Sequence, residues 1–228
     1  MHQLKTKTVK KLFYKKWLYK IVLECGGLSY LHRRGIDYVA SVIPTSQNPW
    51  IRGHESTVAK NRTQLIKIGV ELEKLLANEE HQLRVESGTC GIFTNSEDLV
   101  EEVTKTLPEF VTEIHKPADN DQANFLLTNK NKILCDEFPL DGYQFKIYFK
   151  NGEIKDKALM ENFLHWANNY DGRIHIPNGT KKILSSGAPY FYGQYFYAKD
   201  KKLASMALML MGSHLNKTEE YVLKSDVI

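Results

Sequence analysis

The hydrophobic periodicity of this chain switches repeatedly between two residues and 3.6 residues, and the order of the switches occurs twice. A period of two is typical of a strand with one buried face, and apolar residues three and four apart are typical of a helix. In the first half we expect strand, helix, strand, strand, helix and strand over residues 12–24, 65–76, 81–87, 90–94, 97–114 and 124–136. In the second half the same order falls over residues 143–150, 159–170, 173–176, 190–198, 203–211 and 219–223.

This order predicts an α+β protein made of two ferredoxin-like βαββαβ units in tandem. Residues 12–137 form the first predicted domain and residues 143–228 the second. Residues 1–11 are basic and polar, and we expect them to be a flexible arm. The length of 228 residues and the hydrophobic content of 42% are sufficient for two small cores.

Several classes of protein are disfavoured by what the sequence lacks. Cys25, Cys90 and Cys135 have no zinc-binding or redox spacing, so we expect buried free thiols in a reducing compartment. The longest apolar runs are about eight residues, well short of the length that spans a bilayer. We therefore expect a cytoplasmic protein with no membrane contact, no cofactor and no bound metal.

Positive charge is concentrated at the N-terminus. Residues 1–34 hold nine of the 31 Lys and Arg residues and a single acidic residue, Glu24, although the whole chain has a net charge of only +4. A block that is both basic and aromatic favours polyanions such as nucleic acids.

The predicted strand over residues 12–24 offers one way to bind them. On a regular strand Tyr14, Lys16 and Lys20 share a face, with Lys10 shortly before it. The lysines would neutralise phosphates while Tyr14 stacks on a base. The alternative is a solvated edge strand, whose lysines prevent edge-to-edge aggregation.

A second feature is the segment over residues 190–197, YFYGQYFY, which has six aromatic side chains in eight residues. Because a strand alternates its faces, burial on one side would still turn some of these rings outward. Exposed rings on a sheet are a platform for flat ligands such as nucleobases.

Two segments of the second half resemble signatures of the RNA-recognition motif family. Residues 147–152, IYFKNG, resemble the signature of the first strand of that family. Residues 190–197 match part of the signature of its third strand, at Tyr192, Gly193 and Tyr197. The resemblance covers residues 143–225 and implies an RNA-binding sheet with Tyr148 and Tyr192 as the base-stacking rings. The alternative is that these aromatic residues fill an ordinary strand core.

The segment over residues 44–62 lacks periodicity and contains two prolines, which predicts a long loop. Its candidate binding residues combine cations with one large ring, and they are Trp50, Arg52, Lys60 and Arg62. Arginine forks fit phosphates, a Trp ring can stack, and the following helix N-terminus favours an anion. The alternative is an ordinary exposed loop.

Together these observations predict a non-catalytic protein that binds RNA or single-stranded DNA by electrostatic capture and ring stacking. One alternative is a structural or adaptor subunit of a viral or multi-subunit assembly, in which the methionine-rich helix 203–211 docks on a partner protein. Another is a metal-independent endoribonuclease with His54 as general acid or base. Two ferredoxin-like units in one chain are similar to the CRISPR repeat-processing endoribonucleases, although the glycine-rich loop of that family near the C-terminus is missing here.

Overall fold

The fold is that of a computed structural model, which describes residues 4–42, 56–86, 88–140, 142–154, 156–186 and 190–227. The chain divides into two compact units, unit 1 from Met1 to Leu127 and unit 2 from Thr128 to Ile228. Both contain helices and a sheet, so the predicted α+β class is confirmed. Among the described residues, every helix is too short or too polar to cross a membrane.

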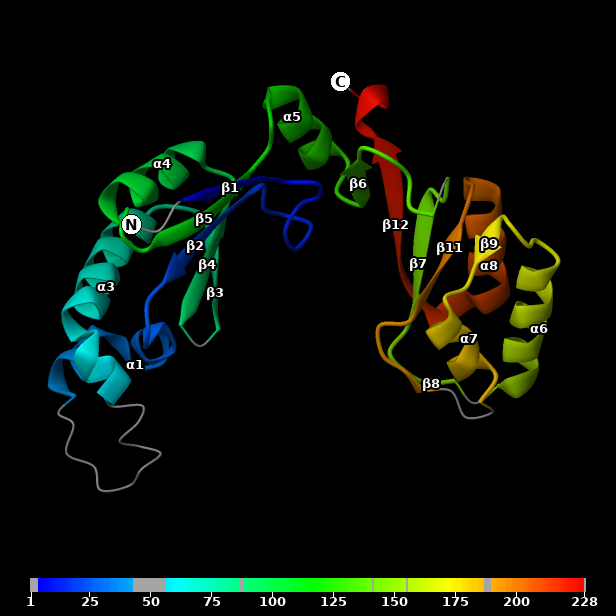
Figure 1. Ribbon diagram of the computed structural model, residues 1–228, viewed down its shortest axis with the longest axis horizontal. Helices are drawn as coiled ribbons and strands as arrows, with labels where there is room; N and C mark the ends of the chain where they lie inside the picture. Colours follow the sequence, from blue (N-terminus) through cyan, green and yellow to red (C-terminus); the bar gives the residue numbers. More distant parts are fainter. Residues whose placement is uncertain are drawn as a thin grey trace. The chain divides into compact units, whose positions relative to one another are not determined.

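Unit 1 contains a five-stranded sheet (Figure 1). Its strands are β1 (Lys5–Thr8), β2 (Tyr19–Glu24), β3 (His81–Glu86), β4 (Thr89–Thr94) and β5 (Val111–Lys116). They lie in the order β1-β5-β2-β4-β3, with β1 parallel to β5 and the other neighbours antiparallel. Strands β2 and β4 therefore lie inside the sheet.

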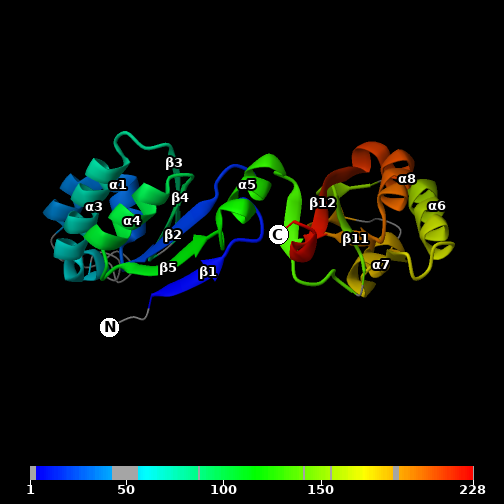
Figure 2. The ribbon, with the colours of Figure 1, turned by 90° about the horizontal axis from the view of Figure 1, so that it is seen from above.

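Three helices of unit 1 lie together on one side of this sheet (Figure 1, Figure 2). They are α1 (Leu28–Ser41), α3 (Arg62–Leu76) and α4 (Glu97–Thr106), and α5 (Asn120–Thr128) follows β5. The core forms where the inward faces meet, and its fully buried residues include Ile21, Leu23, Leu65, Ile68 and Ile92. Burial of these aliphatic side chains is the main favourable term in folding the unit.

Unit 2 has a second five-stranded sheet, in the order β6-β12-β7-β11-β9. Its strands are β6 (Lys132–Cys135), β7 (Phe145–Phe149), β9 (Ile174–His175), β11 (Tyr195–Ala198) and β12 (Leu215–Leu223). β6 is parallel to β12, and the other neighbours are antiparallel. A separate two-stranded sheet pairs β8 (Gly152–Glu153) with β10 (Tyr190–Phe191).

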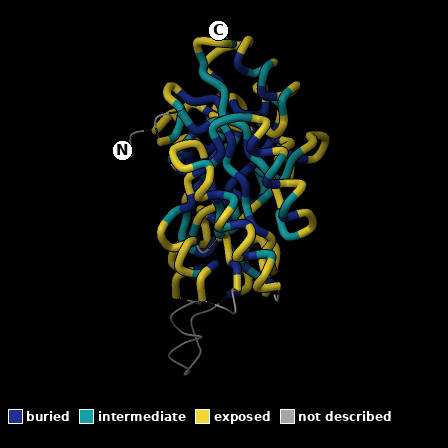
Figure 3. Tube along the Cα trace, turned by 90° about the vertical axis from the view of Figure 1, so that its right-hand side faces the viewer, coloured by how far each residue is buried: buried dark blue, intermediate teal, exposed yellow. Residues whose placement is uncertain are grey.

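The helices of unit 2 also lie on one side of its five-stranded sheet (Figure 1, Figure 2). They are α6 (Lys157–Asn168), α7 (Asn178–Leu184) and α8 (Lys201–Met211), and short 3-10 turns η1 (Gly212–His214) and η2 (Lys224–Asp226) flank β12. Asp156 and Asp200 begin α6 and α8 by accepting hydrogen bonds from Leu159 N and Leu203 N, each at 2.9 Å. Buried residues follow the inward faces of these elements (Figure 3).

The two sheets have the same strand arrangement. After their first strand, the sheet strands and helices of each unit follow the order βαββαβ along the chain. Unit 1 has two helices, α1 and α3, at the first helical position and α5 after its last strand, and unit 2 has short additional elements. The four strands of this pattern lie side by side in the order fourth, first, third, second in both sheets. In both, the strand that precedes the pattern, β1 or β6, pairs in parallel with the last strand, β5 or β12.

The N-terminal segment differs from the flexible arm expected over residues 1–11. Residues 5–8 form β1 and pair with β5, and Val9 N donates to Lys116 O at 3.0 Å. The pairing satisfies backbone groups at the edge of β5, which a lysine-rich sequence does not reveal. Strand β6 pairs with β12 and belongs to unit 2. The boundary between the compact units therefore falls at residues 127–128, before the end of the predicted first domain at residue 137.

Candidate nucleic-acid interface

The sheet of unit 2 has one face toward the helices and one face away from them. On β7, Phe145, Ile147 and Phe149 are buried in the core with the helices, so the alternation turns Lys146 and Tyr148 to the opposite face. On β11 the core residues are Phe196 and Ala198, and Tyr195 and Tyr197 alternate with them. These four residues and Lys217 of β12 form a surface that we call the tyrosine face.

The strand register arranges this surface in two rows. One row runs Lys217, Tyr148, Tyr195 across β12, β7 and β11. The next row runs Glu219, Lys146, Tyr197, His175 and reaches β9. Residues directly opposite on neighbouring strands share a face, so the three tyrosine rings, the two lysines and Glu219 lie on one face of the sheet.

The rings of the tyrosine face contact one another, and lysine ammonium groups lie over them. The ring centroids of Tyr148 and Tyr195 are 5.7 Å apart, and those of Tyr195 and Tyr197 are 5.4 Å apart. Lys146 Nζ lies 3.7 Å from the Tyr195 centroid and 5.0 Å from that of Tyr148, and Lys217 Nζ lies 4.3 Å from the Tyr148 centroid. Cation–π attraction therefore holds both ammonium groups over the rings.

A carboxylate on the same face fixes the orientation of one ring. Tyr148 Oη donates to Glu219 Oε2 at 2.9 Å, and Lys217 Nζ donates to Glu219 Oε1 at 3.1 Å. Burial, followed by these contacts with Glu219, raises the pKa of Tyr148 well above its ordinary value. Burial also raises the pKa of Tyr221 to about 12. Both hydroxyls therefore stay protonated near neutral pH and remain hydrogen-bond donors.

Tyr192, predicted to stack, lies before β11 and not on it. The predicted strand over residues 190–198 is interrupted at Gly193, whose φ of 74° suits a turn. Gly193 N donates to Asn151 Oδ1 at 3.0 Å, which closes this turn. Tyr192 is 78% exposed and Tyr190 67% exposed, but the residue opposite Tyr148 in the ladder is Tyr195. Tyr192 therefore lies in the turn before β11, and Tyr195 is the ring beside Tyr148 on the sheet.

In unit 1 the predicted strand over residues 12–24 is also interrupted. Phe13 and Trp17 pair in a tight hairpin with three residues between them, and two of these, Tyr14 and Lys15, have φ values of 52° and 58°. The hairpin places Lys16 beside Glu80 and over the Trp17 ring, 4.3 Å from its centroid. The prediction that Tyr14, Lys16 and Lys20 share one face of a single strand is therefore wrong, because the hairpin interrupts that strand.

Tyr14 and Lys20 instead meet at a groove on the sheet of unit 1. The groove encloses about 430 Å³, and the residues that line it include Lys11, Phe13, Tyr14, Lys20, Arg84 and Phe93. Tyr14 packs edge-on against Phe93 at 5.0 Å and accepts a hydrogen bond from Arg84 Nη1 at 3.2 Å. We call this surface the hairpin groove. Lys10 is exposed and precedes the hairpin.

The remaining predicted site residues are dispersed. Trp50, Arg52 and His54 lie outside the described residues. Residues 56–60 are helical, Arg62 begins α3, and both Lys60 and Arg62 are exposed. The methionine-rich segment 203–211 is helical within α8, and on its outer side Leu208 is 43% exposed and Met209 85% exposed.

Sequence reasoning missed Lys146, Tyr195, Tyr197 and Lys217 as site residues. The alternation of FKIYF over residues 145–149 and of YFYA over residues 195–198 contained the signal. Among the described residues, no group of three or more His, Cys, Asp or Glu side chains is arranged to hold a metal ion.

Comparison with known proteins adds no relative: no family model, no curated protein and no solved structure matches the chain.

Proposed function

We propose that this protein binds single-stranded nucleic acid, RNA or DNA, through the tyrosine face of unit 2. The observation that carries the proposal is the clustering of three tyrosine rings with Lys146 and Lys217 on the side of the sheet away from the helices. Bases would stack on the rings, and the two ammonium groups would neutralise neighbouring phosphates.

The fold supports the same proposal. The strand order fourth, first, third, second is that of the ferredoxin-like fold, to which we assign both units as five-stranded variants. In the RNA-recognition motif family, which has this fold, the stacking rings lie on the first and third strands. Tyr148 and Tyr195 lie on the corresponding strands β7 and β11 and are direct neighbours.

Unit 1 would add electrostatic attraction. Lys10, Lys11 and Lys20 lie on or near its hairpin groove, and Tyr14 offers one ring that is 48% exposed. Charges of this kind raise affinity for any sequence and make it depend on salt. Specificity for bases would reside in the tyrosine face.

A titration of fluorescently labelled single-stranded RNA and DNA tests the proposal. Tyr195→Leu removes a stacking ring but keeps an apolar side chain, and we expect it to weaken binding by about 5- to 150-fold, which corresponds to about 1–3 kcal/mol. Tyr195→Phe keeps the ring and is expected to bind within about twofold of the wild type. Tyr38→Leu on α1 is the matched control. Equal binding by all four proteins would contradict the proposal.

A second candidate function, a subunit of a larger assembly, is favoured by the exposed Leu208 and Met209 on α8. Exposed apolar side chains at neighbouring positions are typical of protein interfaces. Light scattering after size-exclusion chromatography separates the two functions. An oligomer that persists in about 0.5 M salt, dissociates in Met209→Glu and ignores oligonucleotides would favour the assembly subunit.

A further inference from the structure

The sheet of unit 1 contains a histidine with a lysine on each side. In the strand register His115 of β5 lies opposite Lys7 of β1 and opposite Lys20 of β2. Residues directly opposite one another share a face of the sheet. The three side chains therefore form one row, Lys7, His115, Lys20, on the face where Lys20 also lines the hairpin groove.

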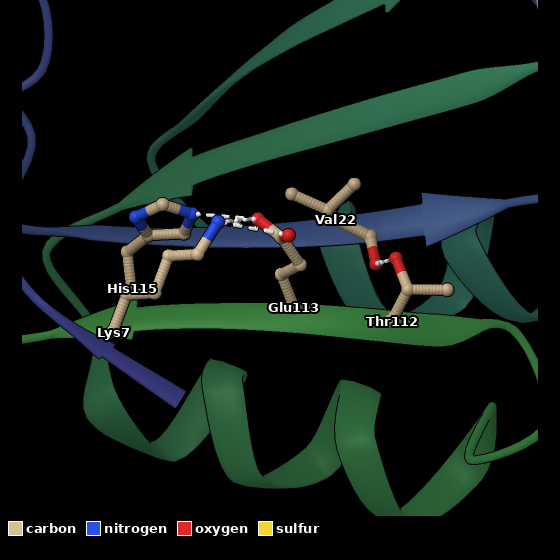
Figure 4. A network of polar contacts seen from close by, with 5 residues as sticks. All are labelled: Lys7, Val22, Thr112, Glu113 and His115. Carbon is tan, nitrogen blue, oxygen red and sulfur yellow. Dashed lines mark hydrogen bonds and ion pairs between the residues drawn. The ribbon is translucent and has the colours of Figure 1, made fainter. Parts of the chain in front are cut away.

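A carboxylate completes this cluster (Figure 4). Glu113 lies two residues before His115 on β5, so both project from the same face. Its Oε2 is 3.2 Å from His115 Nε2 and 2.8 Å from Lys7 Nζ. Carboxylate oxygens of an ionised Glu only accept, so Nε2 of His115 carries the proton in this contact, and Nδ1 keeps its lone pair.

The surroundings keep this imidazole neutral near pH 7. Burial lowers the pKa of His115 below its ordinary value of 6.5. The hydrogen bond to Glu113 raises this pKa in part, whereas the positive charges of Lys20 and Lys7 lower it further. From the hairpin, the uncharged ring of Phe13 packs edge-on at 5.6 Å. A neutral imidazole whose second nitrogen is oriented by a carboxylate is the arrangement of a general base.

We propose that His115 is the general base of an RNA-cleaving site on unit 1. The proposal rests on the nucleic-acid binding proposed above and adds a reaction to it. The chain of the RNA would lie along the hairpin groove, with Tyr14 against a base and Lys7 and Lys20 on either side of the scissile phosphate. Glu113 is a positioning residue, because it acts through the imidazole.

The reaction is an internal transesterification. The 2′-hydroxyl of one nucleotide gives its proton to His115 Nδ1, and the oxygen forms a bond to the adjacent phosphorus. The bond from phosphorus to the 5′-oxygen of the next nucleotide breaks, and that oxygen takes a proton from the Lys20 ammonium. The imidazolium then returns a proton to Lys20. The products are a 2′,3′-cyclic phosphate and a 5′-hydroxyl, and the protein is unchanged.

The experiment incubates the 228-residue protein with end-labelled RNA of mixed sequence in EDTA, between about pH 5 and pH 8. We expect fragments that end in 2′,3′-cyclic phosphate, and no cleavage of the same sequence as DNA. His115→Ala should slow cleavage by about 100-fold or more, which is the usual contribution of a general base. His165→Ala, which removes an exposed histidine of α6, is the matched control and should cleave at the wild-type rate.

Each outcome decides the proposal. RNA that is bound but not cleaved by the wild type would overturn the cleavage site and leave the binding function standing, whereas neither binding nor cleavage would overturn both. Cleavage by His115→Ala at the wild-type rate would also overturn the site. Should His115→Ala fail to fold by circular dichroism, the wild-type pH profile decides. A rate that rises with pH through a pKa below 6.5 supports His115 as the base, and a flat profile overturns it.

Discussion

Tyr148 has two separable roles, one in its ring and one in its hydroxyl. The ring belongs to the tyrosine face, whereas the hydroxyl donates to the buried carboxylate of Glu219. We expect Tyr148→Phe to lower the free energy of unfolding by about 1–2 kcal/mol, because a buried acceptor loses a donor. RNA affinity should stay within about twofold, because the ring remains. Chemical denaturation and RNA titration of the same preparation measure both. A large loss of affinity without a loss of stability would contradict this division.

His115 predicts a pH dependence of stability. Its pKa is lower in the folded protein than the ordinary value of 6.5, so the unfolded chain binds the proton more tightly. The contribution of the neutral His115 to the free energy of unfolding is fully present above pH 6.5. It is lost as the pH falls from 6.5 to the pKa that His115 has in the folded protein. Denaturant unfolding between pH 5 and pH 8 should show this decline, and His115→Gln should reduce it, with His165→Gln as control. A stability that rises on acidification through this range would contradict the assignment.

At the residue scale, the sequence indicated that the candidate site is aromatic, but it did not identify most of the residues that form the tyrosine face. Tyr148 was named from the resemblance over residues 147–152, and its alternation with buried neighbours on β7 turns it away from the core. Tyr192 was named by its position in the family signature, and the turn at Gly193 was not expected within the aromatic run. The contacts of His115 could not be predicted, because Lys7 and Lys20 are about a hundred residues away along the chain.

Among the elements, the hairpin over residues 13–17 contains unfavourable backbone conformations. Positive φ disfavours residues with a Cβ atom, and both Tyr14 and Lys15 adopt it. We expect Lys15→Gly to raise the free energy of unfolding by about 0.5–1 kcal/mol, because glycine removes this cost. Lys105→Gly near the end of α4 should instead destabilise the protein by up to about 1 kcal/mol. Thermal unfolding compares the two, and a destabilised Lys15→Gly would show that the hairpin is not strained.

Elements with a local signal were predicted well, and those that depend on distant partners were not. The helix predicted from residue 97 begins where expected, and Ser96 caps it, since its Oγ accepts from Leu99 N at 3.1 Å. The predicted helix over residues 97–114 is wrong at its end, where β5 begins at Val111. The strand expected at residues 124–128 is helical in α5. Gln122 anchors that helix by donating to Val9 O at 3.0 Å, a contact that no local pattern contains.

For the whole molecule, the recurring order of elements was visible in the sequence, but the pairing of the first strand of each sheet was not. β1 and β6 are short, and each pairs in parallel with a strand about 90 to 110 residues later. Such pairing depends on the assembled sheet rather than on local periodicity. The sequence therefore placed β1 in an arm and β6 in the first domain.

Unit 2 should fold by itself. Residues 128–228 contain the whole five-stranded sheet and a continuous core, so we expect cooperative thermal unfolding by circular dichroism. A chain of residues 137–228 lacks β6 and should unfold at a lower temperature, because the edge of β12 loses its partner. Equal melting temperatures would show that β6 does not stabilise the unit.

Photo-crosslinking tests the location of the ligand most directly. A single-stranded RNA oligonucleotide containing 4-thiouridine is irradiated with the 228-residue protein, and the attached peptides are identified by mass spectrometry. We predict crosslinks to residues 145–149 and 195–198, the two central strands of the tyrosine face. Crosslinks confined to helices α6, α7 and α8, on the other side of the sheet, would contradict the account.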